Sequence, residues 1–132
     1  MDRVEREQRW HGAKTKRAAA QLCFTQGFFS ESVTLSYYAC YQAMWIVLDD
    51  PPAGLWRHGG LINEFCRGRW QTLPAMPQAL ASLRKKLDRL YVYRIQSDYE
   101  AKSLNQSQAQ EALDIADEVL RLVAQHTSLM LH

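Results

Sequence analysis

An arginine and an aspartate continue a stripe of leucines in the stretch LYVYRIQSDYE at 90–100. The leucines recur at steps of three and four residues, so they share one face of a helix. They are Leu80, Leu83, Leu87 and Leu90. The same steps lead next to Arg94 and Asp98, and a guanidinium in line with a buried stripe is costly to remove from water without a partner. We therefore expect Arg94 to be paired, and Asp98 is within reach.

The Arg94–Asp98 pair allows two interpretations. In the first, the ion pair closes the end of a helix and is purely structural, with the hydroxyl of Tyr91 joining the network. In the second, this face opens into a polar cleft or a subunit interface, where Arg94 binds a phosphate or a partner's carboxylate. Helical periodicity alone does not decide between them.

Basic clusters offer further positions for binding an anion, although each is also typical of a solvated helix face. They are KTKR at 14–17, RGRW at 67–70 and RKK at 84–86. If the second cluster lies near the helix end that carries Arg94, then Arg67 and Arg69 form a positive groove with it. Trp70 is then available to stack on a nucleobase. This is our prediction for nucleic-acid binding.

The histidines show no pattern of metal ligands. His58 stands at the start of a short helical segment, where ordering the preceding loop is the better interpretation than catalysis. His11, His126 and His132 lack the spacing of a metal site. The sequence also contains no glycine-rich phosphate loop and no helix-turn-helix pattern. We therefore expect no metal and no cofactor.

The elements that must position these residues are all helical. Breaks rich in Gly and Pro separate helix-sized segments, and Ser107 followed by Gln110 matches a capping box at the start of the last one. Five helices are expected near 3–26, 31–49, 56–67, 76–101 and 107–126. No alternating pattern predicts a strand. The predicted fold is all-α, a single domain over residues 1–132 that forms an up-and-down bundle of four long helices plus a short helix.

The second predicted helix is apolar on more than one face. One stripe recurs at helical spacing and is expected in the core. It consists of Val33, Tyr37, Cys40, Met44, Val47 and Leu48. Tyr38 and Trp45, seven residues apart, fall together on another side of this helix. Because subunit interfaces favour large aromatic residues, we predict that Tyr38 and Trp45 contribute to a dimer interface.

The composition indicates a globular protein of a reducing compartment. The chain has 132 residues, 47% of them hydrophobic, and a formal net charge of +2, which neither requires nor excludes a nucleic-acid partner. Cys23, Cys40 and Cys66 have neither disulfide nor zinc spacing, so a cytoplasmic location is expected. No secretion signal and no membrane-spanning segment is expected, because the longest strongly apolar run is the short AMWIVL at 43–48.

Several segments resemble, in order and spacing, the HEPN domain, and most closely its UPF0332-like branch of small prokaryotic proteins. They are SYYACYQAMWIVL at 36–48, RHGGLINEF at 57–65, LYVYRIQSDYE at 90–100 and QAQEALDIADEVLRLV at 108–123. The resemblance covers about residues 18–123. It implies a helical bundle that dimerises. Many HEPN domains are metal-independent endoribonucleases in toxin–antitoxin, CRISPR-linked and antiphage systems, and others are non-catalytic partners of nucleotidyltransferases.

The resemblance also implies roles for single residues. In nuclease members an arginine is followed, after four residues, by a histidine, and two such motifs meet at the dimer interface. Arg94 matches the arginine that holds the scissile phosphate, but Tyr99 occupies the place of the histidine. A free histidine, with a pKa near ~6.5, exchanges protons at neutral pH, whereas a free tyrosine, near ~10, is a poor base. Asp98, beside the arginine, is expected to be a structural partner more than a proton acceptor.

Two functions follow from these observations. The first is an RNA-directed dimer of a toxin–antitoxin or antiphage defence module, in which any endoribonuclease activity rests on Arg94 with Asp98 or Tyr99 of an altered Arg-x4-Tyr motif. The second is a non-catalytic HEPN dimer that binds a nucleotide, an RNA or a protein partner, for example a nucleotidyltransferase.

Overall fold

The fold consists of helices alone in the part of the chain that is described. A computed structural model describes residues 1–71 and 77–127, with side chains from residue 80 onward in the second range. The helices are α1 (Arg3–Thr25), α2 (Phe29–Leu48), α3 (His58–Arg67), α4 (Pro77–Tyr99) and α5 (Gln106–His126). The predicted all-α class is confirmed. Every helix in the described ranges is too short or too polar to span a bilayer.

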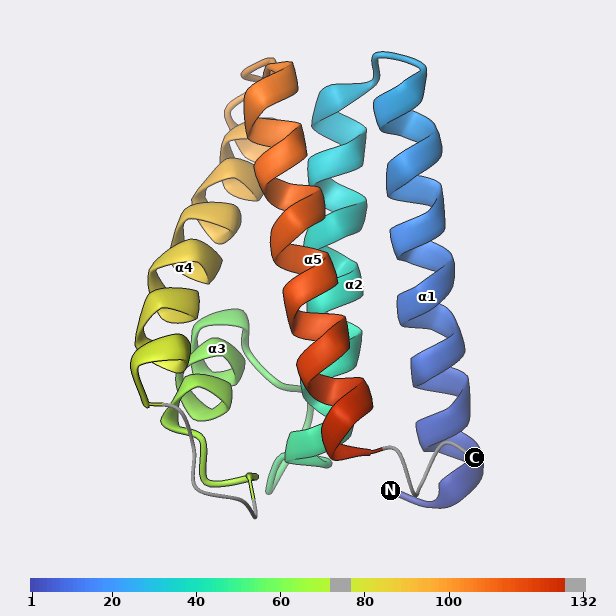
Figure 1. Ribbon diagram of the computed structural model, residues 1–132, viewed down its shortest axis with the longest axis vertical. Coiled ribbons are helices and arrows are strands. Elements are labelled where there is room, and N and C mark those ends of the chain that lie inside the picture. Colours follow the sequence, from blue (N-terminus) through green and yellow to red (C-terminus); the bar gives the residue numbers. More distant parts are fainter. Residues whose placement is uncertain (72–76, 128–132) are drawn as a thin grey trace.

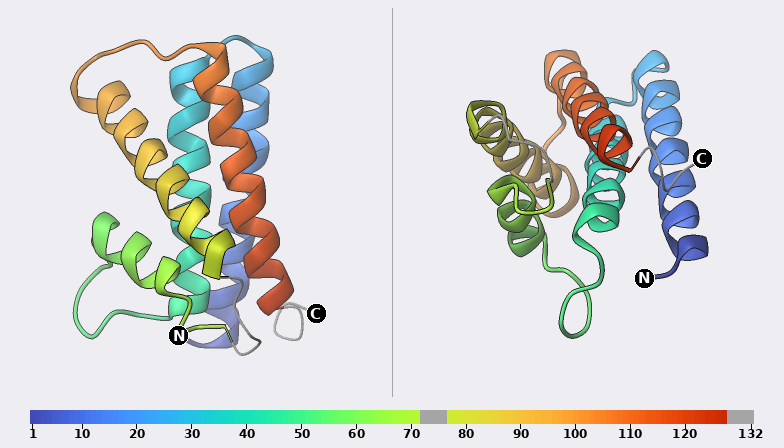
Figure 2. Two further views of the ribbon diagram at one scale, coloured as in Figure 1. Left: turned by 60° about the vertical axis from the view of Figure 1, so that its left-hand side comes forward. Right: turned by 60° about the horizontal axis from the view of Figure 1, so that its bottom comes forward.

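Helix α2 lies at the centre of the bundle. It packs against α1 and α5 most extensively and also against α3 and α4. The four long helices run up and down in chain order, and α3 lies beside the first half of α4 (Figure 1). Figure 2 shows α4 inclined to α5, with the two helices farther apart where α4 ends. The end of α4 is therefore held mainly by α2.

The core confirms the predicted leucine stripe of α4 and most of the predicted stripe of α2, in which Val47 and Leu48 are only partly buried. The leucines of α4 are 0–4% exposed, and α4 packs against α2, α3 and α5. Helix α2 is buried on more than one side, since its buried residues include neighbouring positions such as Ala43, Met44, Trp45 and Ile46. Arg94 continues the leucine stripe and is only 4% exposed. A charged side chain thus occupies a core position at the far end of α4.

The capping box of α5 differs from the prediction. The side chain of Asn105 accepts from the amide of Gln108 at 2.9 Å, and the side chain of Gln108 accepts from the amide of Asn105 at 2.9 Å. The prediction of Ser107 with Gln110 was therefore wrong by two residues. Asn is as good an N-cap residue as Ser, and Asn105 precedes Ser107 in the chain, so the helix begins directly after Asn105.

Candidate functional site

Arg94 lies at the centre of a group of tyrosines on α2 and α4. Its Nη1 donates to the hydroxyl of Tyr38 at 3.0 Å and to the carboxylate of Asp98 at 3.4 Å. The guanidinium carbon lies 5.1–5.7 Å from four aromatic ring centroids, a distance typical of cation–π contacts. The rings are those of Tyr37, Tyr38, Tyr91 and Tyr99. The predicted pairing of Arg94 with Asp98 is therefore present, within an aromatic surround.

Asp98 compensates the arginine only in part. A hydrogen bond between charged groups is ordinarily about 2.7–2.9 Å long, and the Arg94–Asp98 contact is 3.4 Å. Asp98 also accepts from Thr34 Oγ1 on α2 at 3.2 Å. Nη1 of the guanidinium makes the hydrogen bonds to Tyr38 and Asp98, the side chain of Tyr99 also interacts with the guanidinium, and the buried Nε has no partner among the described residues. The edge of the guanidinium that includes Nε can therefore donate to a further ligand.

His58 belongs to the same cluster, which the sequence alone did not indicate. Its Nδ1 is hydrogen-bonded to the hydroxyl of Tyr37, and its ring is stacked 5.8 Å from the ring of Tyr91. The ring of Tyr41 lies 5.0 Å away on another side. Tyr37 and Tyr91 also lie beside Arg94. The two tyrosine rings therefore connect the imidazole with the guanidinium.

The loop between α2 and α3 fixes the position of His58. Helix α2 ends at Leu48, and the C-cap residue Asp49, with a φ of 64°, turns the chain away from the helix axis. The indole of Trp56 donates to the carbonyl of Asp49 at 2.7 Å, and the hydroxyl of Tyr41 donates to the carbonyl of Trp56 at 2.6 Å. These bonds hold the loop against α2. His58, the first residue of α3, is thereby held against the tyrosines.

The electrostatics of the cluster favour a neutral imidazole beside a charged guanidinium. Burial lowers the pKa of His58, and the positive charge of Arg94 lowers it further. Burial raises the pKa of Tyr37 and of Tyr41, so both hydroxyls stay protonated at neutral pH. For Arg94, burial lowers the pKa and the interactions with Tyr38 and Tyr37 raise it, with a raised value as the result. The site thus pairs a permanent cation with a neutral imidazole.

The predicted groove formed by the RGRW cluster is not present. Trp70 stacks on Phe65 at 4.9 Å and donates its indole N–H to the carbonyl of Phe65 at 2.7 Å, so its ring is engaged within the chain. Arg67 pairs with Glu64 at 3.1 Å, and Arg69 is exposed. His58 begins α3 and Arg67 ends it, so about 14 Å along the helix axis separates the two residues. These residues do not converge on Arg94.

Trp45 has little surface to offer a partner. It is 4% exposed, its indole N–H donates to Asp50 at 3.0 Å, and the guanidinium of Arg9 covers its ring at 3.8 Å. Tyr38 belongs to the Arg94 cluster. On α4, the helix that carries Arg94, Val92 is 49% and Tyr99 is 74% exposed. The subunit interface itself stays a prediction.

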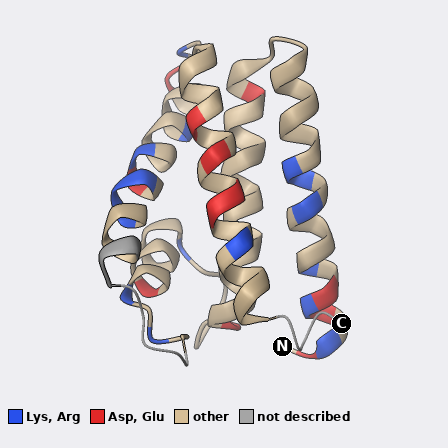
Figure 3. Cartoon of the chain, in the orientation of Figure 1, with Lys and Arg blue, Asp and Glu red and all other residues tan. Residues whose placement is uncertain are grey.

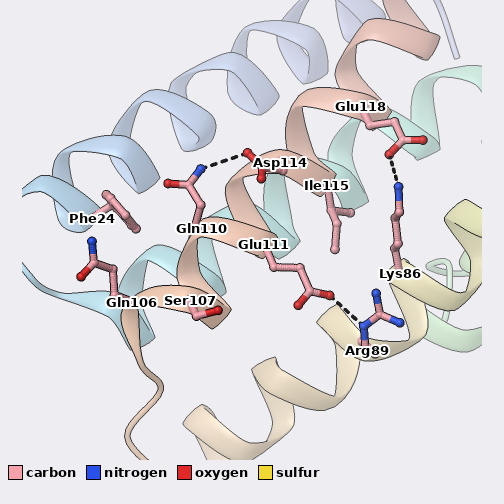
Figure 4. A pocket seen from close by; sticks show the side chains of 10 residues that line it. All are labelled: Phe24, Lys86, Arg89, Gln106, Ser107, Gln110, Glu111, Asp114, Ile115 and Glu118. Carbon is pink, nitrogen blue, oxygen red and sulfur yellow. Dashed lines mark hydrogen bonds and ion pairs between the residues drawn. The ribbon is translucent and has the colours of Figure 1, made fainter.

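A groove of about 750 Å³ lies between α4 and α5, away from the Arg94 cluster. Its cations are already paired, Arg89 with Glu111 at 2.7 Å and Lys86 with Glu118 at 3.1 Å (Figure 4). Figure 3 shows several acidic positions along α5 and several basic positions along the neighbouring α4. This groove is a poor site for an anion. Within the described ranges no cluster of His, Cys, Asp and Glu forms a metal site.

Comparison with known families identifies the fold. The model of the HEPN domain matches residues 60–126, just over half of the chain. The chain belongs to the HEPN family. The matched part of this HEPN protein includes Arg94, Asp98 and Tyr99 but begins after His58. A search of curated proteins gives no significant match. The place of His58 in the cluster is therefore known from the structure alone.

Proposed function

We propose that this HEPN protein binds RNA at the Arg94 cluster, as a cytoplasmic homodimer of a toxin–antitoxin or antiphage defence module. The observation that carries the proposal is the incompletely paired guanidinium, which is 4% exposed and has an unpartnered Nε. A buried charge without full compensation is unfavourable. A phosphate that accepts two parallel hydrogen bonds from the edge of the guanidinium that includes Nε would complete the pairing of Arg94.

Tyr99 covers the guanidinium on the side of the solvent. It is the last residue of α4, its ring lies 5.7 Å from the guanidinium carbon, and it is 74% exposed. An exposed side chain at a helix end rotates freely, so Tyr99 can move aside to admit a phosphate. Its ring is then available for stacking on a nucleobase, which is a sequence-tolerant contribution to binding single-stranded RNA. Tyr99 is thus better suited to binding than to proton transfer.

The outer face of α4 supports the proposed homodimer. Val92, Ile95 and Tyr99 follow one another at steps of three and four residues on this helix, and two of them are largely exposed. Pairing of two such faces would bury these side chains. Replacing Val92 with Glu is expected to convert the dimer to a monomer in light scattering after gel filtration. If Val92→Glu remains dimeric, this face is not the interface.

RNA binding is tested with a fluorescent single-stranded RNA of mixed sequence by anisotropy at several salt concentrations. Arg94→Met keeps much of the side-chain volume and is expected to weaken binding by about 10–100-fold, the value of a charged hydrogen-bonded contact. Arg94→Lys is expected to recover only part of the affinity, because lysine lacks the planar fork. Arg121→Met, an exposed arginine on α5, is the matched control. Equal affinity of Arg94→Met and wild type would refute the proposal.

A second candidate is the non-catalytic partner of a nucleotidyltransferase. The observation in its favour is Tyr99 at the position where HEPN nucleases carry histidine, since a tyrosine supports binding more readily than turnover. The discriminating measurement is co-elution of the purified protein with a nucleotidyltransferase encoded beside it. A stable complex together with failure to bind RNA would favour this candidate over the first.

A further inference from the structure

We propose that single-stranded RNA bound at Arg94 continues across the accessible side of α2 to Arg9 and Lys16 of α1. This inference rests on the proposed RNA binding and adds the path that the strand takes away from the Arg94 cluster. The cluster is built from α2, α3 and α4, whereas Arg9 and Lys16 belong to α1. A strand that contacts all three cations must therefore cross α2.

Helix α2 is accessible along one strip of its surface. Its partly buried residues between positions 34 and 42 recur at steps of three and four, so they lie on one side of the helix. This α2 strip consists of Thr34, Leu35, Tyr38, Tyr41 and Gln42. Helices α1 and α4 both pack against α2 but do not pack against each other in the described part of the chain. The strip offers two partly exposed tyrosine rings against which the bases of a single strand can pack.

Cations from both neighbouring helices are hydrogen-bonded to the α2 strip. Nη1 of Arg94 on α4 donates to Tyr38 at 3.0 Å. Nη1 of Arg9 on α1 donates to Gln42 at 2.8 Å. Because these two acceptors are four residues apart, they are separated by about 6 Å along the axis of α2. The two guanidiniums thus approach the strip within about one helical turn of each other, which lets one short RNA strand contact both.

Arg9 is held in position by neutral groups. Its guanidinium carbon lies 3.8 Å from the centre of the Trp45 ring, and Gln42 accepts from its Nη1. Among the described residues no carboxylate is paired with Arg9, whereas Arg6 and Arg17 of the same helix form ion pairs with aspartates. An arginine that is oriented by neutral partners keeps its charge available for a phosphate.

Lys16 extends the positive surface along α1. It lines a groove of about 300 Å³ between α1 and α2 together with Arg9 and Gln42, and no group in the described ranges is paired with it. Gly12 lies between Arg9 and Lys16 on the same side of the helix, and a side chain there would meet nothing within 4 Å. A glycine within a helix is destabilising relative to alanine, and no contact inside the described chain requires it here. The space above Gly12 is open to the sugar-phosphate backbone of a strand.

The start of α3 adds neutral hydrogen-bond donors beside the α2 strip. The buried hydroxyl of Tyr37 donates to Nδ1 of His58, so the hydrogen of the neutral imidazole is on Nε2. The ring of His58 lies 5.0 Å from that of Tyr41, and its Nε2 has no partner among the described residues. Arg57 occupies the N-cap without a side-chain cap, so the amides of residues 58–60 have no acceptor within the helix. Such donors favour an anionic strand on this side of α2.

The path is tested with the full chain and a labelled single-stranded octanucleotide by anisotropy at several salt concentrations. Lys16→Gln should weaken binding by about 2–5-fold, the value of an exposed ion pair. It should also lower the slope of the logarithm of affinity against the logarithm of salt concentration by about 0.7, the value for one phosphate contact of a single strand. Lys14→Gln removes the same charge from the opposite side of α1 and is the matched control, with little effect expected. Glu5→Gln, which removes the acidic side chain of the groove, should strengthen binding.

The length of the RNA separates this inference from the proposed binding at Arg94. A dinucleotide has a single bridging phosphate, so its affinity should fall in Arg94→Met but not in Lys16→Gln or Arg9→Gln. An octanucleotide can reach α1, and its affinity should fall in all three variants. If Arg9→Gln does not fold, Lys16→Gln alone decides the matter, because Lys16 has no partner in the described ranges whose loss would disturb the helix packing.

The possible outcomes are distinct. Octanucleotide binding that depends on Arg94 but is unchanged in the α1 variants refutes the path across α2 and leaves RNA binding at Arg94 standing. Equal losses in Lys14→Gln and Lys16→Gln also refute the path, since they would reflect only the total charge of α1. Failure of wild type to bind either RNA removes both proposals.

Discussion

Arg94 on α4 and Tyr38 on α2 are joined by a hydrogen bond of 3.0 Å, with the guanidinium carbon 5.6 Å from the tyrosine ring. This contact ties the end of α4 to the central helix. Tyr38→Phe keeps the ring and removes the bond, so Nη1 of Arg94 is left with only the longer contact to Asp98. We expect the free energy of unfolding to fall by about 1.5–3 kcal/mol, measured by urea denaturation.

Tyr93→Phe is the matched control for that measurement. The hydroxyl of Tyr93 donates to Glu111 at 3.2 Å in a partly buried position on the same helix. Its loss is expected to change stability by less than about 1 kcal/mol, because water can replace the bond at the surface. Equal losses in the two variants would show that the Tyr38 contact has no special weight in holding α4.

Arg94→Met distinguishes a structural arginine from a functional one. Replacing Arg94 with Met removes a buried charge that is costly to desolvate, but it also removes the hydrogen bond to Tyr38 and leaves Asp98 without its partner. Because these effects oppose each other, we expect a loss of less than about 3 kcal/mol in the free energy of unfolding, measured by urea denaturation, while the RNA affinity falls. A loss of stability of more than about 3 kcal/mol would instead support the purely structural interpretation of the Arg94–Asp98 pair.

The pH dependence of stability follows from the lowered pKa of His58. The unfolded chain binds a proton to this histidine near the ordinary value of about 6.5, and the folded chain binds it only at a lower pH. Stability linked to His58 is therefore complete above that value and is lost as the pH falls toward the folded pKa. We expect wild type to lose more stability than His58→Gln between about pH 7 and pH 5. Parallel curves for the two proteins would contradict the lowered pKa.

The sequence predicted the helices and the burial of Arg94 because both follow from local periodicity. Steps of three and four residues carried the leucine stripe on to position 94, and the structure confirms it. The place of His58 was not predictable, because it depends on how Trp56 and Tyr41 hold the loop before α3. Its only signal in the sequence was a histidine at a helix start.

The wrong predictions for two tryptophans have a similar physical cause. Periodicity assigns a residue to one side of its helix but does not say what covers that side. Trp45 was predicted at an interface, yet Arg9 of α1 lies over its ring at 3.8 Å. Trp70 was predicted to stack on a base, yet Phe65 occupies its face at 4.9 Å. A contact with the distant helix α1 covers Trp45, and a contact with a residue five positions earlier in the chain covers Trp70.

Gly60 in the first turn of α3 provides a test that uses stability and binding together. An alanine there would meet nothing within 4 Å, and alanine favours a helix by up to about 1 kcal/mol relative to glycine. We expect Gly60→Ala to raise the free energy of unfolding and to weaken RNA binding, because the added methyl group obstructs the backbone amides. Gly12→Ala in α1, equally free of neighbours, should stabilise the protein to a similar extent. If Gly60→Ala binds RNA as wild type does, the strand does not approach the start of α3, and the RNA must reach Arg94 from another side.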